Sequence, residues 1–112
     1  MKGPDRVQAA LEAAGLTIQV VKLSASARTA QLAAEAIGAE LGSIVKSLVF
    51  LADGEPVLVL VAGDRRADPA KLKTLLGARR VMIADAERVK ETGFSIGGVP
   101  PVGHLRPLPT WI

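Results

Sequence analysis

The sequence predicts an α/β domain with a mixed sheet, in which strands and helices alternate around one β-hairpin. Some segments repeat apolar residues at helical spacing, others are short continuous apolar runs, and Asp53-Gly54 separates two of these runs. The 112 residues suffice for one hydrophobic core, so we expect a single domain over residues 1–112. An apolar fraction of 49% predicts that most of the chain packs.

The first third of the chain predicts a helix, a strand and a second helix. Apolar residues three and four positions apart predict the helix over Asp5–Ala14. A mostly apolar segment predicts the strand over Ile18–Leu23. Thr29 can cap the second helix, Ala30–Ile37, and Gly38 suits its C-terminal cap.

The middle of the chain predicts a hairpin. Ile44–Leu51 is the first strand, and Asp53-Gly54 is typical of a type I′ turn. Val57–Ala62 is an unbroken apolar run, which predicts a central strand buried on both faces.

The remaining elements are shorter. Asp68-Pro69 is a good N-cap and first-turn pair for a helix that runs through Leu76 and stops at Gly77. The other predicted elements are a strand at Val81–Ile83, a helix at Asp85–Glu91 and the beginning of a strand within Leu105–Ile112.

Composition disfavours several classes of protein. The absence of cysteine excludes disulfides and thiolate metal sites, and His104 is the only histidine, so we expect no metal. Val57–Ala62 is too short to span a bilayer, and the N-terminus lacks a signal-peptide pattern, so we expect a cytoplasmic protein without a membrane partner. The aromatic residues, Phe50, Phe94 and Trp111, are too few for a base-stacking platform.

Lys46 interrupts a segment, IVKSLVF at 44–50, that otherwise predicts core. The simpler interpretation places this lysine on a solvent-facing edge strand, and the pattern alone favours it. However, Ile44 and Leu48 share its face, and a lysine beside an apolar pocket can anchor a phosphate or a carboxylate. Both interpretations stay open on these residues alone.

A turn rich in glycine and proline is the second candidate. It consists of Gly97, Gly98, Val99, Pro100, Pro101, Val102, Gly103 and His104. Glycine permits close approach of the backbone to a ligand, and proline stiffens the loop. Its free backbone N–H groups could hold a carbonyl or an oxyanion. The pattern alone favours a simpler role, a tight turn between strands.

Basic side chains gather across one loop and helix, and the net charge is +3. They are Arg65, Arg66, Lys71, Lys73, Arg79 and Arg80. A solvated face is the simpler interpretation, and contact with a nucleic-acid backbone is the functional one. No GxSxG motif surrounds any serine, which disfavours a serine hydrolase.

Four segments together resemble one known family. They are SARTA at 26–30 before an alanine-rich helix, IVKSLVF at 44–50, VLVLVAGDRR at 57–66 and TGFSIGGVPPVGH at 92–104. In this order they resemble the YbaK/ProX-like domains, free-standing relatives of the editing insertion of bacterial prolyl-tRNA synthetase. The resemblance runs from about Thr17 to Ile112.

The resemblance implies a mixed, barrel-like sheet flanked by helices, with a pocket on one side. It implies an enzyme, an aminoacyl-tRNA deacylase, that hydrolyses the ester between an amino acid and tRNA, usually the tRNA for proline. Aminoacyl-tRNA would be the substrate and prolyl-tRNA synthetase a partner, and we expect no cofactor. Family members continue beyond the position of Ile112, so we expect this domain to lack its C-terminal part.

The family's lysine corresponds to Lys46, the predicted catalytic residue, which would anchor the terminal phosphate or ribose. The predicted substrate-binding residues are Arg28, Thr29, Ser47, Gly97, Gly98, Val99, Pro100, Pro101, Gly103 and His104. Water would be the nucleophile, and the enzyme would accelerate hydrolysis by positioning the ester and by electrostatic stabilisation. Two alternatives stay open: a non-catalytic module of the same fold that binds tRNA or the aminoacyl group, and an interaction protein whose Lys46 is solvated.

Overall fold

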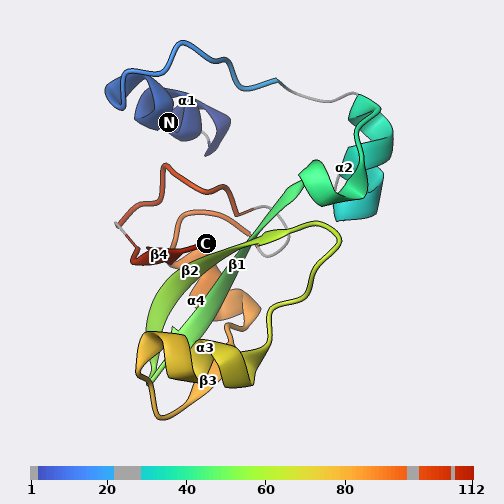
Figure 1. The fold of residues 1–112 in the computed structure, drawn as a ribbon. Helices are drawn as coiled ribbons and strands as arrows, with labels where there is room; N and C mark the ends of the chain where they lie inside the picture. The colour runs from blue at the N-terminus through green and yellow to red at the C-terminus, as the bar shows by residue number, and fades with distance from the viewer. Residues whose placement is uncertain (1–2, 22–28, 96–98, 107) are drawn as a thin grey trace.

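The computed structural model describes residues 3–21, 29–95, 99–106 and 108–112, which form a four-stranded mixed sheet in the order β3-β1-β2-β4 (Figure 1). Strand β1 (Val45–Ala52) pairs antiparallel with β2 (Glu55–Ala62) and with β3 (Val81–Ile83). Strand β2 also pairs in parallel with β4 (Thr110–Trp111). The predicted mixed sheet is confirmed. The four strands of the described residues do not close on themselves, so barrel-like closure stays a prediction.

The hairpin forms at the predicted turn. Asp53 and Gly54 have φ angles of 50° and 84°, the left-handed values that a type I′ turn requires. The Asp53 carboxylate accepts hydrogen bonds from the backbone N–H groups of Arg79 at 3.0 Å and Arg80 at 2.8 Å. These two bonds lower the pKa of Asp53 below its ordinary value. They also tie the hairpin tip to the chain that enters β3.

Side chains of β1 and β2 alternate between two hydrophobic cores, one on each face of the sheet. The first core consists of Phe50, Val57, Val59 and Leu72 of α3 (Pro69–Leu76). The second consists of Val49, Leu58, Ala84 and Val89 of α4 (Ala86–Lys90). Strand β2 is therefore buried on both faces, as its continuous apolar run predicts.

The two longer helices after residue 29 have the predicted boundaries. The Thr29 side chain accepts a backbone N–H of α2 (Ala30–Ile37) at 3.1 Å, and Gly38 ends that helix with a φ of 67°. Asp68 and Gly77 cap α3 in the same way. A short 3₁₀ helix, η1 (Leu41–Ser43), leads into β1.

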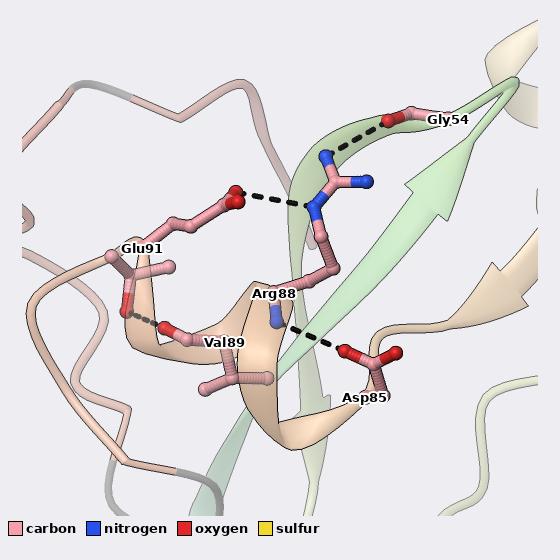
Figure 2. Close-up of polar contacts among 6 residues, drawn as sticks. Gly54, Asp85, Arg88, Val89 and Glu91 are labelled. Atoms are coloured by element: carbon pink, nitrogen blue, oxygen red, sulfur yellow. Dashed lines mark hydrogen bonds and ion pairs between the residues drawn. The ribbon is translucent and has the colours of Figure 1, made fainter.

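Helix α4 has only five residues and is fastened to the hairpin through Arg88. The Arg88 guanidinium donates to the Gly54 carbonyl at 3.0 Å and to Glu91 at 3.1 Å (Figure 2). Asp85 caps the helix by accepting the Arg88 backbone N–H at 2.9 Å. So short a helix is not stable in isolation, and these contacts together with Val89 hold it against the sheet.

The strand predicted over Ile18–Leu23 is wrong where the structure describes it, up to residue 21. Residues 16–21 are irregular and follow α1 (Gly3–Ala13) without entering the sheet. The Gln8 amide donates to the Ile18 carbonyl at 3.1 Å and accepts the Val20 N–H at 2.8 Å. A side chain therefore takes the backbone groups that a neighbouring strand would have paired. Leu23 lies outside the described residues.

The strand predicted within Leu105–Ile112 is confirmed only at Thr110–Trp111. Proline has no N–H to donate to a ladder, and Pro109 stands just before β4. The Pro109 carbonyl still accepts the Leu58 N–H at 2.8 Å, so the chain reaches β2 before the strand begins.

Candidate functional site

A cavity of about 390 Å³ lies beside the first half of β1, on the face that α4 covers. Its walls come from α2, β1, the β3–α4 segment and the loop after α4. The lining residues are Thr29, Ala30, Ala33, Ile44, Val45, Lys46, Ser47, Leu48, Val49, Ile83, Ala84, Val89 and Val99. Most of this lining is apolar, and Lys46 is its charged member.

Lys46 lies at a locally open edge of the sheet. Strand β3 pairs only with the segment from Phe50 to Ala52, so no strand of the described part of the chain pairs with β1 on that side at position 46. By alternation the Lys46 side chain leaves toward the α3 face, and its ammonium donates to the Arg65 carbonyl. A neutral carbonyl leaves the positive charge uncompensated, and no carboxylate in the described ranges forms an ion pair with it. The charge is therefore available to an anion.

Ser47 and Thr29 provide polar groups to the cavity. Ser47 shares the α4 face with Val49, so its side chain is directed toward the cavity. The Thr29 oxygen accepts the Leu32 N–H as the cap of α2, which leaves its own hydroxyl hydrogen free for another acceptor. Arg28, the third polar residue predicted here, lies outside the described residues.

The glycine-proline turn reaches the cavity through Val99. Gly97 and Gly98 lie outside the described residues, so the predicted amide cradle stays a prediction. His104 Nε2 hydrogen bonds the Pro100 carbonyl at 2.7 Å and so closes the turn on itself. Gly103 packs against α1: a Cβ there would lie 3.1 Å from the Arg6 carbonyl. Four other predicted residues of the turn follow Val99 in the sequence but do not line the cavity: Pro100, Pro101, Gly103 and His104.

The cavity thus brings together four of the predicted site residues, Thr29, Lys46, Ser47 and Val99. Four further residues of the cavity wall were not predicted from the sequence: Ala30, Ala33, Ala84 and Val89. Ala30 and Ala33 are one helical turn apart, and this spacing of small residues on an otherwise apolar helix could have indicated a surface that leaves space.

All six predicted basic side chains are exposed. They lie in the loop before α3, on α3 itself and in the loop after it: Arg65, Arg66, Lys71, Lys73, Arg79 and Arg80. We call this set the α3 basic face. The Lys46 ammonium contacts the carbonyl of Arg65, so the α3 basic face begins beside the cavity residue that carries the charge.

Acidic and histidine side chains do not gather into a metal-binding group of three within the described ranges. The same ranges contain no helix long and apolar enough to cross a membrane.

Residues 24–112 match the model of the aminoacyl-tRNA editing domain. This chain belongs to the aminoacyl-tRNA editing domain family. The predicted resemblance is therefore confirmed.

Relatives of this editing domain include parts of much longer proteins. The proline–tRNA ligase of Maridesulfovibrio salexigens is 43% identical over 76 residues, which cover 67% of this chain and 13% of the ligase. The uncharacterized protein YwhH of Bacillus subtilis is 39% identical over 85 residues, 75% of this chain and 54% of that protein. The editing domain therefore spans about half of YwhH and a small part of the ligase.

A solved structure has the same fold. The crystal structure of a protein proposed to be a trans-editing enzyme for prolyl tRNA synthetase superposes with a TM-score of 0.88 at 52% sequence identity. The superposition covers 96% of the present chain and 69% of the other.

Proposed function

We propose that this editing domain hydrolyses the ester of a mischarged aminoacyl-tRNA, with the amino acid in the cavity and the tRNA on the α3 basic face. The observation that carries the proposal is an apolar cavity with Lys46 at its edge, the lysine ammonium lying on the Arg65 side. An aminoacyl ester joins a small side chain to a polyanion. The cavity would take the first part, and the α3 basic face, which meets the edge of the cavity where Lys46 contacts Arg65, would take the second.

The Lys46 ammonium would exchange the Arg65 carbonyl for the terminal phosphate or ribose of the tRNA. The exchange is sterically simple because the lysine stem is flexible and β1 has an open edge at this position. A phosphate compensates the positive charge, which a carbonyl does not, so the bound arrangement is electrostatically favoured.

Water would be the nucleophile, because the cavity lining contains no histidine beside Ser47 or Thr29 to activate a hydroxyl. The backbone amides of the turn at 97–103 would hold the aminoacyl carbonyl and stabilise the oxyanion that forms on it. Catalysis would then depend on positioning and on fixed dipoles rather than on a covalent intermediate.

The amino acid in the cavity would be a small one, since the cavity of about 390 Å³ bounds the side chain that it can hold. A steric pocket rejects larger side chains well but discriminates one methylene by only about 1–3 kcal/mol. Proline–tRNA ligases are among the relatives, which supports the tRNA for proline as the carrier and prolyl-tRNA synthetase as a partner. The proposed deacylase would act in the cytoplasm and without a cofactor. Barrel-like closure of its sheet also remains part of the proposal.

Release of labelled amino acid from mischarged tRNA tests the function. The substrates are tRNA for proline carrying alanine, cysteine or serine, and the protein is present at catalytic concentration. Loss of the residue that anchors the tRNA end would misplace the ester, and a misplacement of about 1 Å can cost on the order of a hundredfold in rate. We expect a loss of that size in Lys46→Ala, with an unchanged thermal unfolding midpoint.

Lys90→Ala is the matched control, because it removes an exposed lysine whose partner is Glu87 on its own helix. Near-normal release by Lys46→Ala would overturn the assignment of this residue.

A second function, binding without hydrolysis, is favoured by one observation: the Lys46 ammonium contacts Arg65 on the α3 side instead of the cavity interior. Tight binding of mischarged tRNA with no release of amino acid, in the same assay, would favour this alternative.

A further inference from the structure

Helix α1 contacts the rest of the molecule at the loop that follows α4. None of its residues is fully buried. Gly3 lies against the Phe94 ring, since a Cβ there would be 3.1 Å from a ring carbon. At the other end of the loop, Gly103 lies against α1. A Cβ added at Gly103 would be 3.1 Å from the backbone of Val7, so the absence of a side chain permits this contact. The helix therefore touches both ends of the loop that carries the turn.

Arg6 makes the most directional of these contacts. Its guanidinium donates to the Gly93 carbonyl at 2.6 Å. The guanidinium carbon also lies 5.0 Å from the centre of the Phe94 ring, over its face. A charge-assisted hydrogen bond and a cation–π contact constrain one planar group in two directions.

The contact continues from Arg6 to the wall of the cavity. The Phe94 ring meets the His104 ring edge-on, with 6.0 Å between centroids and an angle of 87°. His104 in turn holds the Pro100 carbonyl at 2.7 Å, next to Val99 in the cavity lining. Arg6, Phe94, His104 and Pro100 form one continuous series, which we call the Arg6 stack.

The loop is closed at its base without Arg6. The Leu105 N–H donates to the Thr92 carbonyl at 2.9 Å, and the buried Thr92 hydroxyl donates to the Val89 carbonyl at 2.7 Å. These bonds attach the two ends of the loop to α4 and the core. The Arg6 stack connects residues between these two ends, from Phe94 to Pro100, which is next to Val99 in the cavity lining.

We infer that Arg6 is a positioning residue for the described part of the glycine-proline turn, residues 99–104, and that α1 sets the placement of Val99 and Pro100 through the Arg6 stack. This inference rests on the proposed deacylase function. It extends that function to a residue outside the cavity, on a helix that contributes nothing to the cavity lining. A misplacement of about 1 Å can cost on the order of a hundredfold in rate.

The first arm of the test is steady-state deacylation by Arg6→Ala, Arg6→Lys and Phe94→Leu. We expect kcat to fall about tenfold or more in Arg6→Ala, with KM changed by less than about threefold, because the turn holds the reacting carbonyl and not the tRNA. Arg6→Lys should recover most of the rate, since an ammonium keeps one donor and a cation over the ring. Lys90→Ala removes the same charge and should behave as the unsubstituted chain.

The double variant Arg6→Ala/Phe94→Leu distinguishes a stack from two separate contributions. Residues in one contact network are not additive, so the double variant should lose no more rate than the worse single variant. A rate loss in the double variant equal to the product of the two single losses would overturn the inference.

The second arm needs no activity. Backbone amide shifts of Gly103 and His104 in two-dimensional NMR should move in Arg6→Ala and stay in place in Lys90→Ala, with thermal unfolding measured in parallel. Unchanged shifts at both residues, or a rate loss that only follows the folded fraction, would overturn the inference. If Arg6→Ala does not fold, Phe94→Leu supplies both measurements. If the unsubstituted chain releases no amino acid, the proposed function fails while the NMR arm still decides the role of Arg6.

Discussion

The hairpin with α3 and the layer of α1 with the loop after α4 are held together by different kinds of contact. In the hairpin the backbone pairs without interruption from Val45 opposite Ala62 to Ala52 opposite Glu55. In the α1 layer single side chains make the connections, such as Arg6 to a carbonyl 87 positions away. The first region lines the cavity with residues of β1, and the second lines it with Val99, which belongs to a loop that single side chains join to α1.

The largest expected effect is in the hairpin. Leu58 is 0% exposed and lies in the core between β2 and α4. Truncation of a buried leucine leaves a cavity and costs about 2–5 kcal/mol, so Leu58→Ala should lower the free energy of unfolding by that amount. Denaturant titration measures it. Leu75→Ala, on the exposed side of α3, is the control and should change little; equal losses in the two variants would contradict the assigned burial.

A smaller effect concerns the tip of the hairpin. The backbone N–H groups of Arg79 and Arg80 lower the pKa of Asp53 below its ordinary value of 3.8. The folded state therefore binds its proton less readily than the unfolded state, and the stabilisation is present above that ordinary value and lost as pH falls through the folded pKa.

Asp53→Asn isolates this charge, because asparagine tolerates the left-handed conformation of the turn. The variant should be less stable than the unsubstituted chain at neutral pH, and the difference should shrink as pH falls below 3.8. Thermal unfolding midpoints across this range measure the difference. A difference that stays constant with pH would show that the carboxylate charge is not responsible.

The smallest expected effect is in the α1 layer. Gln8→Ala removes the amide that pairs with Ile18 and Val20. Exchange of the Val20 amide hydrogen should become faster, while the free energy of unfolding changes by less than about 0.5 kcal/mol, as is usual for surface substitutions. Hydrogen exchange followed by NMR measures the first quantity. A global loss of stability would mean that residues 16–21 are more firmly integrated than their contacts indicate.

This contrast explains how far the sequence could predict the structure. The caps of α2 and α3, the turn at Asp53-Gly54 and the buried β2 are set by neighbouring residues, and all were predicted correctly. The strand at Ile18–Leu23 was predicted incorrectly, because its apolar residues permit a strand but no partner lies beside the described part. Strand formation depends on a neighbour that periodicity does not reveal.

The candidate site divides in the same way. Lys46 could be identified because a charge interrupts an apolar strand, and Val99 because it lies in a distinctive turn. The Arg6 stack could not be found from the sequence, since its members are ordinary residues at distant positions. Ala30 and Ala33 were not predicted as cavity residues because alanine is common in helices for reasons of propensity alone.

The pairing of β4 with β2 has a consequence for the order of folding. Thr110 lies opposite Leu58, so this contact closes a loop that contains α3, β3, α4 and the glycine-proline turn. Hairpin strands meet after a two-residue turn, whereas this parallel pair must first overcome the entropy of closing a long loop. The β1–β2 hairpin and its apolar faces are therefore expected to form early, and the β4 edge is expected to join late.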